Sequence, residues 1–148
     1  MKTSMTIIIV VLITLILLLC NTLGLLENVF PQEKISIILK LEKFVLKNGQ
    51  EKDGKMLWNK MIDQDTYNVI ILGKRSLLFG TVKKGIPPIG LFFIASSDQG
   101  EVGYSYIIVA FEDPSLTILE NKELAAEEFE RVAILFYDSI KNQGQMEI

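Results

Sequence analysis

The sequence contains no histidine and only one cysteine, Cys20. Without histidine the chain cannot use Ser-His-Asp or Cys-His catalysis, an imidazole general base or a histidine-ligated metal site. A single cysteine excludes an intramolecular disulfide. Any catalysis would have to depend on carboxylates, lysine, tyrosine or backbone groups. No stretch carries a catalytic, nucleotide-binding or metal-binding motif, so we expect a protein that is not an enzyme and has no cofactor or metal.

An excess of positive charge is also lacking. The chain has 15 Lys and Arg against 18 Asp and Glu, which gives a net charge of −3. Binding to nucleic acid needs a basic face that neutralises phosphates, and anionic lipid is attracted by basic clusters. The composition therefore indicates no nucleic-acid partner. Charged residues make up 22% of the chain, which argues against intrinsic disorder.

The N-terminus contains a long hydrophobic run. Residues 6–26 contain no charged side chain. As a helix, these residues would span about 30 Å, the thickness of the hydrocarbon core of a bilayer. We therefore predict that residues 1–27 form a single-pass membrane anchor. Lys2 and the N-terminal amine give the side before the run a slight excess of positive charge over the flank directly after it, although lysines soon follow from Lys34 onward. The positive-inside rule therefore only slightly favours placing the following domain on the extracytoplasmic side.

Two other interpretations of the same run remain open. In a cleaved signal peptide, Lys2 would be the charged n-region and residues 5–19 the apolar h-region, with Thr22 and Gly24 near the cleavage site. In a lipoprotein, Cys20 would be the lipidated residue, because a leucine lies three residues before it. Leu19 departs from that pattern, since a small residue is expected there. The protein would then be secreted or lipid-anchored.

Residues 28–142 are long enough for one domain that folds without disulfides or metal. Residues 35–47 fit helical spacing and strand alternation, and we favour a helix because Pro31 precedes them and Asn48-Gly49 follows. Residues 48–55 read as a loop and 56–62 as a short helix or strand. β-rich segments follow at four places: 67–72, 76–82, 91–95 and 102–111.

The clearest prediction is a C-terminal amphipathic helix. Apolar residues recur at helical spacing, with Asn121 as the expected N-terminal cap; they are Ala125, Phe129, Val132, Phe136 and Ile140. Residues 143–148 are expected to be a frayed tail. Together the elements predict an α+β domain, in which an antiparallel sheet of about four or five strands is packed by helices.

Five residues are candidates for partner binding. The loop 83–90 combines two lysines and two glycines with the apolar and rigid residues Ile86, Pro87, Pro88 and Ile89, so a partner would meet a preformed surface. Trp58 is the only tryptophan, and tryptophan is enriched at interface hot spots. The alternative for the loop is a plain connection, and for Trp58 a position on the core or at the membrane surface.

For the other candidate residues, a structural role is favoured over a functional one. Residues 73–76 (Gly-Lys-Arg-Ser) lack the glycine-rich turn and following helix of a phosphate site, which favours a hairpin turn. Asp63 and Asp65 lack the rest of a calcium loop. The remaining candidates are two sets: carboxylates on the polar side of a helix (Glu123, Glu127, Glu128, Glu130), and aromatic residues that either pack the core or line a ligand pocket (Tyr104, Tyr106, Phe92, Phe111).

Three functions follow as hypotheses. The first is a membrane-anchored, non-enzymatic protein-interaction module, for instance an accessory subunit of a membrane complex. The second is an extracytoplasmic domain that senses or binds a small molecule in an apolar cavity between sheet and helix. The third is an enzyme that uses carboxylates, which would require two acidic side chains converging in a cleft.

Overall fold

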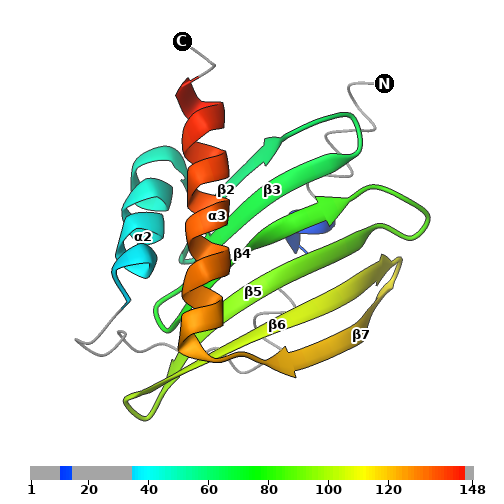
Figure 1. The fold of residues 1–148 in the computed structure, drawn as a ribbon. Helices are drawn as coiled ribbons and strands as arrows, with labels where there is room; N and C mark the ends of the chain where they lie inside the picture. Colours follow the sequence, from blue (N-terminus) through cyan, green and yellow to red (C-terminus); the bar gives the residue numbers. More distant parts are fainter. Residues whose placement is uncertain (1–10, 15–34, 146–148) are drawn as a thin grey trace.

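The computed structural model describes residues 11–14 and 35–145 (Figure 1). A short helical stretch occupies residues 11–14. The other elements follow in the order α2 (Ser36–Asn48), β1 (Gln50–Lys52), β2 (Lys55–Met61), β3 (Thr66–Leu72), β4 (Ser76–Lys83), β5 (Ile89–Asp98), β6 (Glu101–Glu112), β7 (Ser115–Glu123) and α3 (Ala126–Gln145).

The seven strands form one antiparallel sheet in chain order, β1-β2-β3-β4-β5-β6-β7. The α+β class is therefore confirmed, but the sheet has more strands than the sequence indicates. β1 lies inside the predicted loop 48–55, where Asp53 and Gly54 adopt positive φ angles (52° and 79°) that reverse the chain tightly into β2. β7 was also missed, because nearly all its side chains are exposed and it shows no apolar alternation.

Helix is the correct choice for the segment that also fitted a strand. α2 buries one stripe of side chains against the sheet: Ile37, Ile38, Leu41 and Val45. It ends at Gly49, whose N–H donates a hydrogen bond to the carbonyl of Val45 at 2.7 Å. A Cβ atom at Gly49 would lie 2.6 Å from that carbonyl oxygen and 2.8 Å from the carbonyl oxygen of Leu57. The close approach between the end of α2 and β2 therefore requires glycine.

The C-terminal helix is confirmed, but its predicted start is wrong. Asn121 is not a helix cap; it lies in β7, paired with Ile107 of β6. Strand pairing extends β7 to Glu123, and α3 begins only at Ala126. The apolar stripe faces the sheet, with Phe129, Ala133 and Ile140 buried. Ala125 lies before the helix, where its carbonyl accepts a hydrogen bond from the N–H of Phe129.

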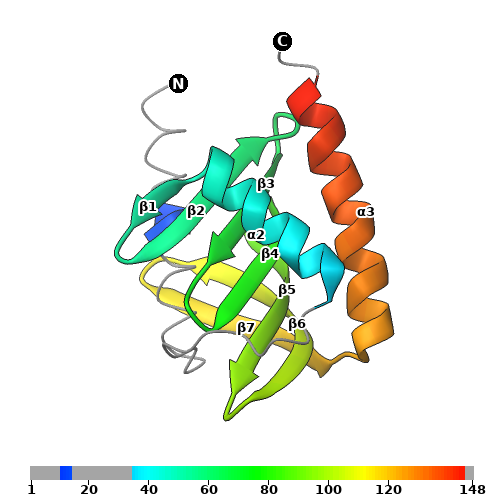
Figure 2. The ribbon, with the colours of Figure 1, turned by 90° about the vertical axis from the view of Figure 1, so that its left-hand side faces the viewer.

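Both helices lie on the same face of the sheet, here called the helix side (Figures 1 and 2). Aromatic rings fill the space between α3 and the sheet. The ring centroid of Phe79 on β4 lies 5.5 Å from Phe129 and 4.8 Å from Phe136 of α3, and 5.6 Å from Phe93 on β5. Phe79 is fully buried and contacts both β5 and α3, so it lies at the centre of the helix-side core.

The opposite face of the sheet, here called the second face, is equally apolar. Ten of its side chains are between 0% and 8% exposed: Leu57, Val69, Ile71, Leu78, Val82, Phe92, Ile94, Ile107, Val109 and Phe111. Residues 11–14 lie on this side, away from α2 and α3 (Figure 2). Leu12, only 5% exposed, packs into this second cluster. Among the described residues, the sheet therefore carries α2 and α3 on one face and residues 11–14 on the other.

The predicted membrane anchor, residues 6–26, lies outside the described part of the chain except for residues 11–14. Across residues 11–14 and 35–145, no helix is both long enough and apolar enough to span a bilayer. The Cys20 lipidation and signal-peptide alternatives also fall on residues that are not described.

Candidate functional site

Three chain reversals meet at one end of the sheet, which we call the hairpin end. They are the turns β2–β3, β4–β5 and β6–β7 (Figure 1). Backbone hydrogen bonds tie the β4–β5 loop to the β2–β3 turn and to the end of β6. The N–H of Lys84 donates to the carbonyl of Asp65 at 2.6 Å, and the N–H of Phe111 donates to the carbonyl of Pro88 at 2.9 Å. The β4–β5 loop is therefore held on both of its sides.

Apolar side chains are exposed at this end. Ile86 is 105% exposed at the tip of the β4–β5 loop, and Ile89 is 43% exposed where β5 begins. Met61 and Ile62, at the end of β2, are also exposed. We call these four residues the hairpin-end patch; β3 and β4 lie between Met61 and Ile89, and the register turns these two side chains to opposite faces of the sheet. Burying one isoleucine side chain against a partner contributes about 1.5–3 kcal/mol to binding, so the fully exposed Ile86 on a held loop can supply that energy.

The structure groups only some of the predicted site residues. Ile86, Pro87, Pro88 and Ile89 lie together at the hairpin end, as their sequence positions require. Trp58 lies apart from them, because it is in the middle of β2 on the helix side. Its indole packs edge-on against the ring of Phe44 in α2, with the ring centroids 5.1 Å apart. Trp58 is therefore half-buried between the sheet and α2.

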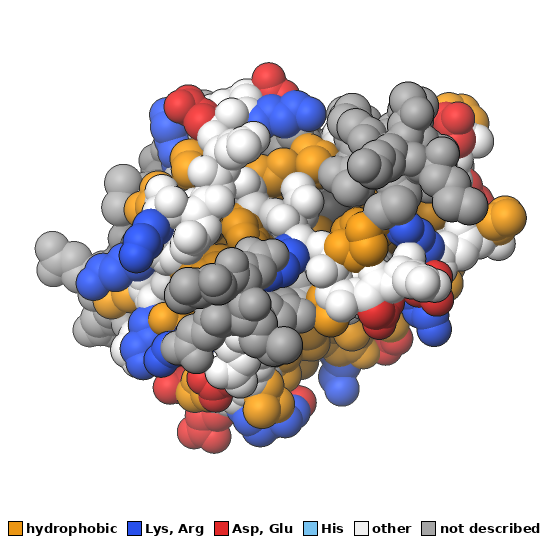
Figure 3. All heavy atoms as spheres, turned by 90° about the horizontal axis from the view of Figure 1, so that it is seen from above, with side chains coloured by type: hydrophobic (Ala, Val, Ile, Leu, Met, Phe, Trp, Pro, Cys, Tyr) orange, Lys and Arg blue, Asp and Glu red, His pale blue; other side chains and the backbone are white. Residues whose placement is uncertain are grey.

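Charges of both signs surround the hairpin-end patch. The basic residues near it are Lys60, Lys83 and Lys84, and the acidic ones are Asp63, Asp65, Glu112 and Asp113. Seen from above the view of Figure 1, the molecule also carries basic and acidic side chains interspersed with apolar ones (Figure 3). An apolar centre with a polar rim of mixed sign is typical of a protein–protein contact.

The other candidate groups have structural roles. Arg75 lies in the β3–β4 turn, and its guanidinium forms an ion pair with Asp98 at 3.7 Å, as fits a hairpin turn. The four predicted aromatics are divided between two layers. Tyr104 packs on Phe129 on the helix side, whereas Phe92 and Phe111 pack edge to face on the second face. Within residues 11–14 and 35–145, no three His, Cys, Asp or Glu side chains form a group that could hold a metal ion.

Two tyrosines on β6 have raised pKa values. Burial is the main cause for Tyr104, and the negative charge of Glu130 adds to it. For Tyr106 the main cause is a hydrogen bond that its hydroxyl donates to the carboxylate of Glu120 on β7. This hydrogen bond joins β6 to β7 and is exposed to solvent, so the two side chains do not form a buried catalytic dyad.

Replacing Glu120 with glutamine should lower the pKa of Tyr106 toward its ordinary value of 10.0. The neutral amide removes the charge that opposes tyrosinate formation. The raised pKa stabilises the fold below the unfolded value of 10.0, and that contribution is lost as the pH rises through the folded pKa. Spectrophotometric titration of tyrosinate, with a Tyr106→Phe variant to assign the transition, measures the shift. An unchanged Tyr106 transition in Glu120→Gln would contradict this account.

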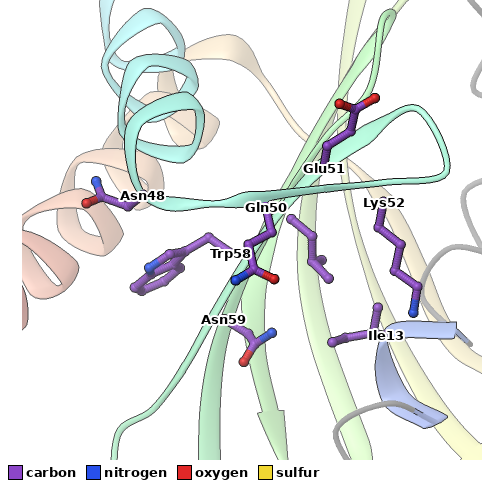
Figure 4. Close-up of a pocket in the computed structure, with 8 residues that line it drawn as sticks. Ile13, Asn48, Gln50, Glu51, Lys52, Trp58 and Asn59 are labelled. Atoms are coloured by element: carbon purple, nitrogen blue, oxygen red, sulfur yellow. The ribbon is translucent and has the colours of Figure 1, made fainter.

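An open hollow of about 420 Å³ lies beside β1 and β2 (Figure 4). Ile13 of the N-terminal stretch and Leu57 of β2 contribute apolar surface, and Lys52 extends over it from β1. Asn48, Gln50 and Asn59 add side-chain amides. The hollow is open and lined by both polar and apolar side chains, and its lining places residue 13 beside β1 and β2.

The second face is the feature that sequence reasoning missed. Residues 69–71 of β3 and 77–79 of β4 are buried without interruption, which is the pattern of strands covered on both faces. That signal was present in the sequence as unbroken apolar runs. The hydroxyl of Tyr67, on the same strand, is buried and has no hydrogen-bond partner in the described part of the chain.

Comparison with known proteins gives no relative. No protein-family model, no curated protein and no solved structure matches this chain significantly.

Proposed function

We propose that the chain is a membrane-held, non-enzymatic protein-interaction domain whose partner binds the hairpin-end patch. In this proposal the N-terminal hydrophobic run holds the domain at a membrane, on the extracytoplasmic side, and the domain acts as an accessory subunit of a membrane complex. The observation that carries the proposal is the complete exposure of Ile86 on a loop that is tied to the β2–β3 turn on one side and to the end of β6 on the other.

Rigidity supports binding at this loop. Pro87 and Pro88 restrict the backbone, and the bonds of Lys84 and Pro88 hold its two ends. A partner therefore gains apolar contact with little loss of loop entropy. Ile89 is a further exposed apolar side chain three residues along the chain, and Met61 and Ile62 are two more at the same end of the sheet.

Charge supports a protein over lipid as the partner. A site that binds an anionic bilayer gains from lysines and loses from acidic residues close to the surface. At the hairpin end lysines alternate with aspartates and a glutamate, so the attraction to anionic lipid is largely cancelled. A protein surface can match both signs around an apolar centre.

Replacing Ile86 with aspartate should reduce recovery of the partner by about tenfold or more, equivalent to about 1.4 kcal/mol. The change places a charge where the partner buries an apolar side chain, and it leaves the fold intact because the side chain is exposed. The measurement is quantitative co-purification of the full chain in mild detergent, with a photo-crosslinking amino acid at position 86 to identify the contacting protein.

Gln99 provides the matched control. It is exposed in the β5–β6 turn at the opposite end of the sheet. Gln99→Asp introduces the same charge and should leave recovery unchanged, and a crosslinker at position 99 should not capture the partner found at position 86. Equal recovery of that partner with wild-type, Ile86→Asp and Gln99→Asp would refute binding at the hairpin-end patch.

A further inference from the structure

We infer that the N-terminal hydrophobic segment, residues 6–26, is the cover of the second face, and that docking there and spanning a membrane are alternative states of the same segment. The inference is independent of the hairpin-end patch. It assigns an occupant to a sheet face that the strands alone leave uncovered.

The second face needs a cover. Its ten buried strand side chains would form a continuous apolar surface in water, and soluble domains rarely expose one of that extent. α2 and α3 pack on the other side of the sheet and contribute no member to this cluster. Among the described residues, those that join the cluster from outside the sheet are Leu12 and Ile13.

The orientation of residues 11–14 is specific. Leu12 is 5% exposed and its neighbour Val11 is 44% exposed, although both are large and apolar. Thr14, on the same short helix, is exposed. A segment that only adhered through general hydrophobicity would not separate two such neighbours, so the helix presents a defined side to the sheet with Leu12 as its anchor.

Docking and membrane insertion compete for the same side chains. The apolar composition that makes residues 6–26 suitable for lipid also suits an apolar sheet face, and Leu12, which packs on that face, cannot contact lipid at the same time. Residues 27–34 connect the segment to the domain and reach at most about 28 Å. The segment therefore stays close to the second face at high effective concentration, and lipid has to displace an intramolecular contact.

The position of Ile13 beside β1 makes the docked state measurable. Ile13 and Lys52 line the same hollow (Figure 4). A full-length chain carrying Ile13→Cys and Lys52→Cys, with the native Cys20 replaced by serine, is synthesised without membranes and treated with a short bismaleimide. A second chain with Ile13→Cys and Lys40→Cys is the control for geometry, because Lys40 is exposed on α2 at the helix side.

We expect crosslinking of the 13–52 pair and little of the 13–40 pair. Adding Leu12→Asp should reduce the 13–52 yield at least fivefold, whereas Val11→Asp should leave it nearly unchanged. Each change replaces one large apolar side chain of the segment with a charged one. A difference between their crosslinking yields therefore reports docking through Leu12. Equal yields for both pairs, or equal effects of both aspartates, would overturn the assignment of the cover.

Lipid vesicles test the competition. When the chain is synthesised in the presence of phosphatidylcholine vesicles, the crosslinking yield of the 13–52 pair should fall at least fivefold as the segment inserts. The segment should also become resistant to protease. Resistance without any loss of crosslinking would overturn the claim that the two states exclude each other. These results do not depend on position 86, so failure of the partner experiment and failure of this one are distinguishable.

Discussion

Replacing Phe79 with alanine is expected to destabilise the fold by about 3–5 kcal/mol. Phe79 is fully buried and its ring contacts Phe93 on the sheet and Phe129 and Phe136 on α3. Alanine would leave a cavity between two rigid layers, and it would remove the edge-to-face and tilted ring contacts that add to area burial. Since α3 follows the last strand, its attachment depends on this cluster.

Urea unfolding followed by the fluorescence of Trp58 measures the effect. Trp58 is the only tryptophan and packs against Phe44 of α2, so its emission reports the separation of α2 from the sheet. Leu135→Ala is the control, because Leu135 lies on α3 but is 60% exposed, and its loss should change the free energy of unfolding by less than about 0.5 kcal/mol. Similar midpoints for Phe79→Ala and Leu135→Ala would mean that the ring cluster does not hold α3.

Replacing Gly80 with alanine is expected to cost about 1–3 kcal/mol or more, although only a methyl group is added. A Cβ atom at Gly80 would lie 2.0 Å from the carbonyl oxygen of Leu91 and 2.8 Å from the Cα atom of Phe92. Both are backbone atoms of the paired strand β5, so no side-chain rotation can relieve the contact. The two central strands would have to separate, which weakens the hydrogen bonds between them.

Gly103→Ala is the matched variant for this prediction. Gly103 lies in β6 of the same sheet, and a Cβ atom there would meet nothing within 4 Å. Alanine at this position should be neutral or stabilising by up to about 1 kcal/mol, because it reduces the conformational entropy of the unfolded chain. The thermal or urea midpoint should therefore fall for Gly80→Ala and stay the same or rise for Gly103→Ala. A decrease of the same size in both would show that glycine is needed for strand flexibility and not for the close approach at Gly80.

The parts of the fold that local patterns predict are those with one buried and one exposed side. The spacing of Phe129, Ala133 and Ile140 predicts α3, and Ile38, Leu41 and Val45 predict α2. β7 gives no such signal, because it is an edge strand whose side chains are mostly in water, and its strand character comes from pairing with β6. Asn121 illustrates the consequence: a residue suited to a helix cap is held in a strand by its neighbour.

The candidate surfaces differ in how far the sequence predicts them. The composition of the loop 83–90 indicates a rigid exposed element, and Ile86 is indeed at its tip. The contribution of Met61 and Ile62 depends on the register of β2, β3 and β4, which no local pattern encodes. Trp58 was a reasonable interface candidate by residue type, yet the alternation of β2 turns it toward α2.

The strict chain order of the sheet has a consequence for how the protein forms. Every strand pairs with the strand that precedes it, so each step of sheet assembly closes only a short loop. Folding rates rise as contacts become more local in sequence, and this sheet avoids the long crossovers that make many β proteins slow. Hairpins can therefore add one after another while the chain leaves the ribosome, and α3 can close over the helix side once the last strand is in place.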